Sequence, residues 1–203
     1  MTQRSYRGLL WTLAVVGLVL DLGSKYAVFR WLYTPSHEGR FEVVPGAFRL
    51  IAQFTDTPPA AEGWRAPFQA WNGPVLPRVN HGALFGLGND HTALANGFFA
   101  AVSVTAALAI LVWSTRRSAT QDRWLCAALG LILAGTLGNL FDRVVFGGVR
   151  DFLYFYWIEW PVFNVADCCL VCGAGLLLLQ AFLAPAAEKD KASEPTAALA
   201  EAK

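Results

Sequence analysis

The segment WLCAALGLILAGTLGNLF, residues 124–141, contains no charged side chain. A helix needs about 20 mostly apolar residues to cross a hydrocarbon core about 30 Å thick, and this segment is close to that length. Its last turn contains Asn139, and Asp142 and Arg143 follow directly. The pattern predicts a transmembrane helix that ends in polar side chains at one membrane surface.

Three further apolar segments of similar length lie at about 8–33, at 94–113 and at about 162–187. The chain has 203 residues, of which 55% are hydrophobic and 15% are charged, whereas about a quarter of the residues in soluble domains are charged. We therefore expect an all-α membrane protein with four transmembrane helices. The net charge of +1 gives no indication of nucleic-acid binding.

Basic residues predict the orientation of these spans. They precede the first span, fill the short loop between the second and third spans, and follow the fourth: Arg4, Arg7, Arg116, Arg117, Arg123, Lys189 and Lys191. The positive-inside rule places them, and with them both termini, in the cytoplasm. A cleaved signal peptide would also begin with arginines, but the apolar region continues beyond Asp21 without a clear cleavage site, which favours a retained helix.

The long loop of about 34–93 then lies outside the cytoplasm. Its short apolar runs at 41–46 and 48–52 alternate with turn residues, which predicts a small extracytoplasmic β-containing cap. A stretch at about 56–77 is rich in Pro, Ala, Gly and Trp and is interpreted as an insertion.

The remaining segments complete the expected organisation. The aromatic run 152–160 is interpreted as an interfacial belt or a short re-entrant element. Residues 1–187 are expected to form a single four-helix membrane domain, and residues 188–203 a flexible cytoplasmic tail.

This topology brings polar residues from distant segments to the outer membrane surface. Side chains three or four residues apart share a helical face, and an ionisable residue within a membrane is a candidate functional group. The layer comprises Asp21, Lys25, Asn139, Asp142, Arg143, Asp151, Asn164 and Asp167, with Asn80 in the outer loop ahead of the second span.

Two aspartates of this layer are the candidates for chemistry. Asp21 has Lys25 one turn away and Asp142 is next to Arg143, which suggests structural ion pairs. Asp151 does have Arg150 beside it, but neighbouring side chains of an extended segment point apart, and no cation lies near Asp167 in sequence. Two such carboxylates can share a proton and activate water, as in aspartic proteases.

Other readings remain open. A proton-coupled transporter also uses intramembrane carboxylates, and an assembly factor could use the polar layer to bind a partner helix. Catalysis by His81 and metal binding by Cys168, Cys169 and Cys172 are the weaker alternatives, because a loop histidine is usually solvated and no histidine lies near the cysteines. No metal and no cofactor is expected.

Five motifs resemble those of the lipoprotein signal peptidases (signal peptidase II), the aspartic proteases of the bacterial inner membrane. They match the family in order and cover nearly the whole chain: DLGSK (21–25), NHGALFG (80–86), GTLGNLFDR (135–143), VRDF (149–152) and FNVAD (163–167). The resemblance implies that Asp151 and Asp167 are catalytic. It also implies that Asn80, Asn139, Arg143 and Asn164 bind substrate or support the catalytic pair.

The resemblance further implies the reaction. The substrate would be a diacylglyceryl-modified prolipoprotein, cut on the amino side of the lipidated cysteine by a monomeric enzyme that contacts membrane lipids and is inhibited by globomycin. The chain departs from the family pattern at Leu84, where a small residue is expected, at Arg150, which puts a cation beside a catalytic aspartate, and in its longer outer loop.

Overall fold

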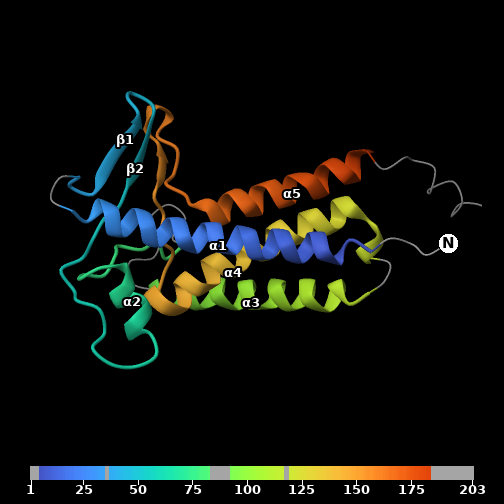
Figure 1. Cartoon of the computed structure of the whole chain (residues 1–203), viewed down its shortest axis with the longest axis horizontal. Helices are drawn as coiled ribbons and strands as arrows, with labels where there is room; N and C mark the ends of the chain where they lie inside the picture. Colours follow the sequence, from blue (N-terminus) through green and yellow to red (C-terminus); the bar gives the residue numbers. More distant parts are fainter. Residues whose placement is uncertain (1–4, 35–36, 83–91, 117–118, 184–203) are drawn as a thin grey trace, which may run out of the picture.

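Four long helices form the body of the protein, as the sequence predicts (Figure 1). The computed structural model describes residues 5–34, 37–82, 92–116 and 119–183. Each long helix is long and apolar enough to cross a membrane: α1 (Arg7–Leu32), α3 (Thr92–Ser114), α4 (Arg123–Phe146) and α5 (Val165–Leu183). The predicted tail and the predicted residues Arg4, Leu84, Arg117, Lys189 and Lys191 lie outside the described residues.

Helix α4 is the centre of the bundle. It packs against α1, α3 and α5. In an apolar stretch of 18 residues, 56% of the α4 residues are buried, whereas the corresponding share in the other three long helices is 11–28%. Local signals set both of its ends. The Asp122 carboxylate accepts the backbone N–H groups of Trp124 at 2.8 Å and Leu125 at 3.1 Å, and Gly147 ends the helix with a left-handed φ of 78°.

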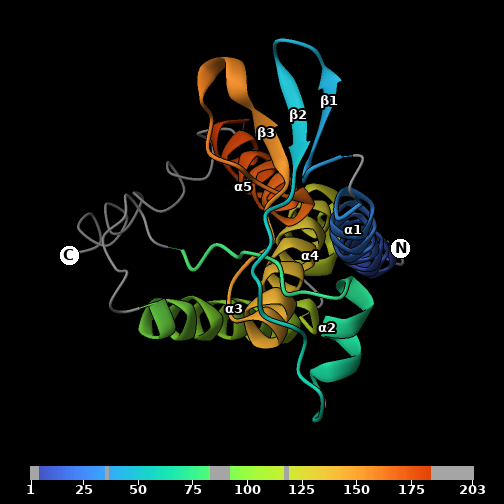
Figure 2. The same ribbon diagram turned by 90° about the vertical axis from the view of Figure 1, so that its left-hand side faces the viewer.

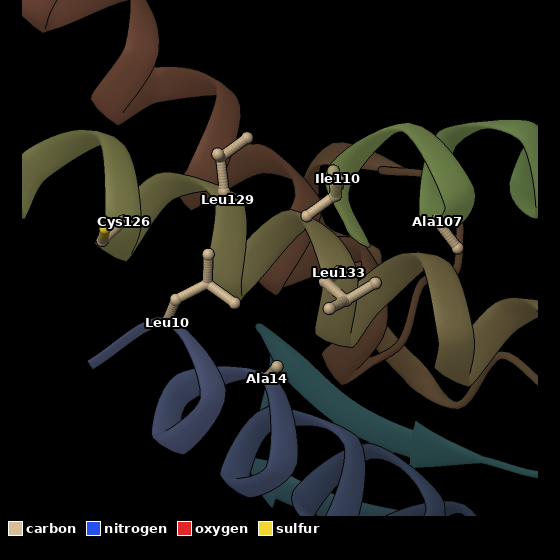
Figure 3. Packing of buried hydrophobic residues seen from close by; sticks show 7 residues of the cluster. All are labelled: Leu10, Ala14, Ala107, Ile110, Cys126, Leu129 and Leu133. Carbon is tan, nitrogen blue, oxygen red and sulfur yellow. The ribbon is translucent and has the colours of Figure 1, made fainter. Parts of the chain in front are cut away.

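The end of the bundle where α1 begins contains a cluster of buried apolar side chains. Figure 3 shows this cluster, in which α4 lies between side chains of α1 and α3. The exposed residues of the bundle are mostly apolar as well, as expected for helices whose outer faces contact lipid. The cluster comprises Leu10, Ala14, Ala107, Ile110, Cys126, Leu129 and Leu133.

A three-stranded antiparallel sheet covers the other end of the bundle (Figures 1 and 2). Its order is β1 (Arg40–Val44), β2 (Phe48–Ile51) and β3 (Leu153–Phe155). The sequence predicts the first two strands but not the third. The aromatic run 152–160, interpreted as an interfacial belt or a re-entrant element, instead forms β3, which pairs with β2. A 3₁₀ turn, η3 (Tyr156–Ile158), follows it.

The predicted insertion contains a short helix, α2 (Ala66–Asn72), that the sequence analysis did not anticipate. The chain leaves and returns along an antiparallel pair, in which the Thr55 N–H donates to Leu76 O at 2.9 Å and the Leu76 N–H donates to Thr57 O at 2.8 Å. Helix α2 packs against α1 and α4, and in the end view it lies on a different side of the bundle from the sheet (Figure 2).

Candidate active site

Asp151 and Asp167 are held by the same asparagine. Nδ2 of Asn164 donates to Oδ1 of Asp151 at 2.7 Å. The backbone N–H of Asn164 donates to Oδ2 of Asp167 at 3.1 Å. The two aspartates that the sequence predicts as a pair therefore both contact Asn164, Asp151 through its side chain and Asp167 through its backbone.

The first turn of α5 positions Asp167. The helix begins at Val165, so Asn164 occupies the N-cap and Asp167 is the third helical residue. Oδ1 of Asn164 accepts the backbone N–H of Asp167 at 3.0 Å, while the Asp167 carboxylate accepts the N–H of Asn164. This reciprocal pair is a capping box made from Asn and Asp, and it fixes the direction of the Asp167 side chain.

Asn139, near the end of α4, connects this pair to buried charges. Its Nδ2 donates to Oδ1 of Asp167 at 2.9 Å. Its Oδ1 accepts from Nδ2 of Asn164 and from Nζ of Lys25, both at 3.2 Å. The amide thus serves as both donor and acceptor, and the Lys25 ammonium defines which way it faces.

Asp21 joins α1 to the start of α5. Its Oδ2 lies 2.8 Å from Nζ of Lys25, so the predicted ion pair is present. Its Oδ1 accepts the backbone N–H of Ala166 at 2.8 Å, one of the amides that a helix N-terminus leaves without an internal partner. Gly138 of α4 lies against this carboxylate, and a Cβ atom there would collide with Asp21 Oδ2.

Asp142 pairs with Arg150 and Lys25, and the predicted pairing with Arg143 is wrong. Nη2 of Arg150 lies 2.7 Å from Oδ1 of Asp142, and Nζ of Lys25 lies 3.3 Å from Oδ2. The backbone N–H of Arg150 also donates to Asp142 at 2.9 Å. Adjacent residues of a helix point about 100° apart, so Arg143 cannot reach the same partners as Asp142.

Arg143 faces α3 instead. Its guanidinium carbon lies 5.4 Å from the ring centroid of Phe99, and its backbone carbonyl accepts from Nδ2 of Asn96 at 3.3 Å. Its Nε is buried and finds no acceptor among the described residues. This donor is therefore available to a ligand.

Arg150 is the largest fully buried side chain of the described residues. Its guanidinium carbon lies 4.3 Å from the ring centroid of Tyr26 and 4.2 Å from that of Phe146. Its Nη1 donates to Oδ1 of Asn72, on α2, at 2.8 Å. Arg150 therefore lies beside Asp151 in sequence but pairs with Asp142 and links it to the insertion.

A second side chain of α2 reinforces this link. Gln69 donates through Nε2 to the carbonyl of Val145 at 2.8 Å, near the end of α4, and its Oε1 accepts the N–H of Ala60 at 3.0 Å. Gln69 and Asn72 are both buried. No sequence motif marks these two residues.

Asn80 completes the set of amides around Asp151. Its Nδ2 donates to Oδ2 of Asp151 at 2.9 Å, and its backbone exchanges hydrogen bonds of 2.7 and 2.8 Å with Val149. His81, next to it, lies with Nδ1 2.9 Å from the carbonyl of Gly147. The rest of this motif, residues 83–86, falls outside the described residues.

Burial and a neighbouring charge alter the acidity of Asp151. Removal from water raises the pKa of Asp151 from its ordinary value of 3.8 to about 6, and the Asp167 charge adds to this increase. The hydrogen bonds from Asn80 and Asn164 act in the opposite direction, because they stabilise the charged form. A carboxyl group of this acidity can accept or release a proton near neutral pH.

Asp151 also borders an open cavity of about 680 Å³, which is within the usual range of about 300–1,000 Å³ for ligand-binding clefts. The cavity reaches Asp151 from the cap side. Two carboxylates held through one asparagine, one of them at the edge of a cleft, can activate a water molecule for attack on a carbonyl group.

Comparisons with known proteins agree on one family. Residues 75–183 match the family described as signal peptidase (SPase) II. A lipoprotein signal peptidase of Rhodopirellula baltica is 36% identical over 84% of this chain and 70% of its own length. One from Photorhabdus laumondii is 36% identical over 88% of this chain and 90% of its own length.

The fold also resembles solved bacterial membrane enzymes. One of them covers 97% of this chain and 98% of its own length with a TM-score of 0.65 at 21% identity. Another covers 91% of this chain and 100% of its own length with a TM-score of 0.66 at 22% identity. At these identities the likeness concerns the arrangement of helices and sheet.

Proposed function

This chain belongs to the signal peptidase II family of membrane aspartic proteases, which remove signal peptides from prolipoproteins, and we propose that it does so with Asp151 and Asp167 as its catalytic pair. The substrate is a prolipoprotein whose cysteine already carries diacylglycerol. The bond that is cut lies on the amino side of that cysteine.

One observation carries this proposal: Asn164 holds both aspartates at once. A water molecule between the two carboxylates loses a proton to one of them as its oxygen attacks the scissile carbonyl. The other carboxyl group, protonated, donates to the carbonyl oxygen. Breakdown of the tetrahedral intermediate then returns a proton to the departing amine, and the pair is restored.

The neighbouring side chains support this cycle without taking part in proton transfer. Asn80, Asn139 and Asn164 hold the carboxylates through the hydrogen bonds already described. Arg143 has a buried Nε–H group without an acceptor among the described residues, and it binds a carbonyl of the substrate. Asp21, Lys25 and Asp142 keep the ends of α1, α4 and α5 together.

The enzyme acts in the bacterial inner membrane as a single four-helix domain, a monomer in contact with lipids. Arg7, Arg116 and Arg123 lie at the end of the bundle opposite the sheet, which by the positive-inside rule is the cytoplasmic end. Both termini are then cytoplasmic and the aspartates lie near the outer surface. As a member of this family, the enzyme is expected to be inhibited by globomycin.

The test is cleavage of a diacylglyceryl-modified prolipoprotein by the purified chain in detergent. We expect Asp151→Asn and Asp167→Asn each to lower kcat by at least about a thousandfold, since each removes a general acid or base. Asp56→Asn is the matched control, because Asp56 is an exposed carboxylate of the cap. Near-normal turnover by either dyad variant would disprove the assignment.

A further inference from the structure

The cavity beside Asp151 extends away from the transmembrane helices into the cap. Except for Phe146, the last residue of α4, its described lining comes entirely from outside the four long helices. One side is the insertion and the strand before it, and the other is the segment that carries Asp151. The lining comprises Ile51, Gln53, Thr55, Thr57, Leu76, Pro77, Arg78, Val79, Asn80, His81, Phe146, Val149, Asp151, Pro161 and Val162.

This cavity is an open groove, and backbone hydrogen bonds hold its walls in place. On the insertion side, the Arg78 N–H donates to Gln53 O at 2.8 Å and the Thr55 N–H donates to Leu76 O at 2.9 Å. On the other side, Asn80 and Val149 form an antiparallel bridge. The groove therefore has extended chain on both flanks, a shape that suits a ligand in extended conformation.

Arg78 gives the groove its charge. The described lining holds three titratable side chains, Arg78, His81 and Asp151. His81 and Asp151 already have hydrogen-bond partners, whereas Arg78 is exposed and no salt bridge joins it to a carboxylate in the described part of the chain. A cation with free donors at a groove wall attracts carboxylates of a bound ligand.

We propose that this groove binds the residues that follow the modified cysteine, as an extended segment, and that Arg78 makes it favour acidic residues there. The inference rests on the proposed function. A signal peptide is apolar and the acyl chains of the modified cysteine need hydrocarbon, so both remain beside the transmembrane helices. Only the polar segment after the cysteine can enter a groove built from the cap.

The first experiment measures kcat/KM for three substrates that share one lipidated signal peptide. Positions two to five after the cysteine are acidic, neutral or basic. A charge contact at an exposed site changes affinity by about two- to fivefold, so we expect acidic above neutral above basic in wild type. Arg78→Glu should reverse the order, and 0.5 M salt should reduce it because exposed charges are screened.

Arg65→Glu is the matched control. Arg65 lies on the same insertion and is exposed, but it does not line the groove, so the wild-type order should persist. An order that is the same in wild type and Arg78→Glu would overturn the groove inference while leaving the proposed function intact. Failure of wild type to cleave even the neutral substrate would instead overturn both.

A crosslinking experiment tests the location directly. A photoreactive residue three positions after the cysteine should label Thr55, Thr57 or Leu76–Arg78 when the uncleaved substrate is bound to Asp151→Asn. The same residue three positions before the cysteine should label other parts of the chain. Labelling of α1 or α5 by the downstream probe would place the segment elsewhere and disprove the inference.

Discussion

The polar layer contains two groups of carboxylates that differ in their partners. Asp21 and Asp142 contact the buried cations Lys25 and Arg150. Asp151 and Asp167 instead receive hydrogen bonds from asparagine amides and from a backbone N–H. Each carboxylate of the first group is tied to a buried cation, whereas no salt bridge in the described part of the chain involves Asp151 or Asp167, and Asp151, whose pKa burial raises to about 6, borders the open cavity. The first group suits structure and the second suits chemistry.

The largest effect is expected for Asp142→Asn, which tests whether the first group has a structural role. The change leaves the charge of Arg150 buried beside a neutral amide, and loss of one partner of a buried ion pair typically costs about 3–5 kcal/mol. We expect that loss in the free energy of unfolding in detergent, with Asp56→Asn unchanged as the control. A variant that is as stable as wild type yet inactive would show that Asp142 acts in catalysis.

Asn72→Ala tests how much the insertion stabilises Arg150, the cation that pairs with Asp142. The change removes the acceptor that the insertion supplies to Arg150. A lost hydrogen bond to a buried charged group costs about 1.5–3 kcal/mol, and we expect a loss of this size in unfolding measurements. Asn72→Asp retains the acceptor oxygen, and Nδ2 of Asn72 has no partner among the described residues, so this variant should keep most of the stability. Equal losses in both variants would argue against the link.

The smallest expected effect concerns the stability of Asp151→Asn as a function of pH. Burial raises the pKa of Asp151 to about 6, so the folded state binds its proton more tightly than the unfolded state does. The stability that this binding contributes is complete below about pH 4 and is lost as pH rises through 6. Above pH 6 the ionised carboxylate therefore opposes folding.

An asparagine at this position carries no charge to bury, but its NH2 group cannot accept one of the two hydrogen bonds that Asp151 accepts from Asn80 and Asn164. That loss is the same at every pH, so we expect the stability of Asp151→Asn relative to wild type to be higher at pH 7.5 than at pH 4 by about 1–2 kcal/mol. Thermal unfolding at both pH values measures it, and Asp56→Asn should show no such dependence. A stability difference that is the same at both pH values would mean that the ionised carboxylate does not oppose folding.

The sequence predicts the parts of the molecule that depend on the lengths of apolar segments and on the spacing of residues along a helix. The four spans follow from runs of apolar residues, and the meeting of Asn139, Asn164 and Asp167 follows from helix spacing combined with the direction of each span. Such inferences need no knowledge of how distant loops fold. The Asp21–Lys25 pair, one helical turn apart, belongs to the same class.

The parts that sequence analysis missed depend on contacts between loops. Strand β3 is an aromatic segment whose backbone partner, β2, lies about a hundred residues away in the chain. Helix α2 is seven residues long, too short for its own pattern to be decisive. The sequence suggests Arg143 as the partner of Asp142 because the two residues are adjacent. The actual partner, Arg150, lies beyond the end of the helix and reaches Asp142 in space.

The contact between Arg150 and Asn72 has a consequence for changing the length of the outer loop. A surface loop can usually change length at little cost, but this insertion carries the acceptor for Nη1 of Arg150. Shortening the insertion and replacing Arg150 should therefore have non-additive effects on stability, so that the insertion and position 150 have to be redesigned together.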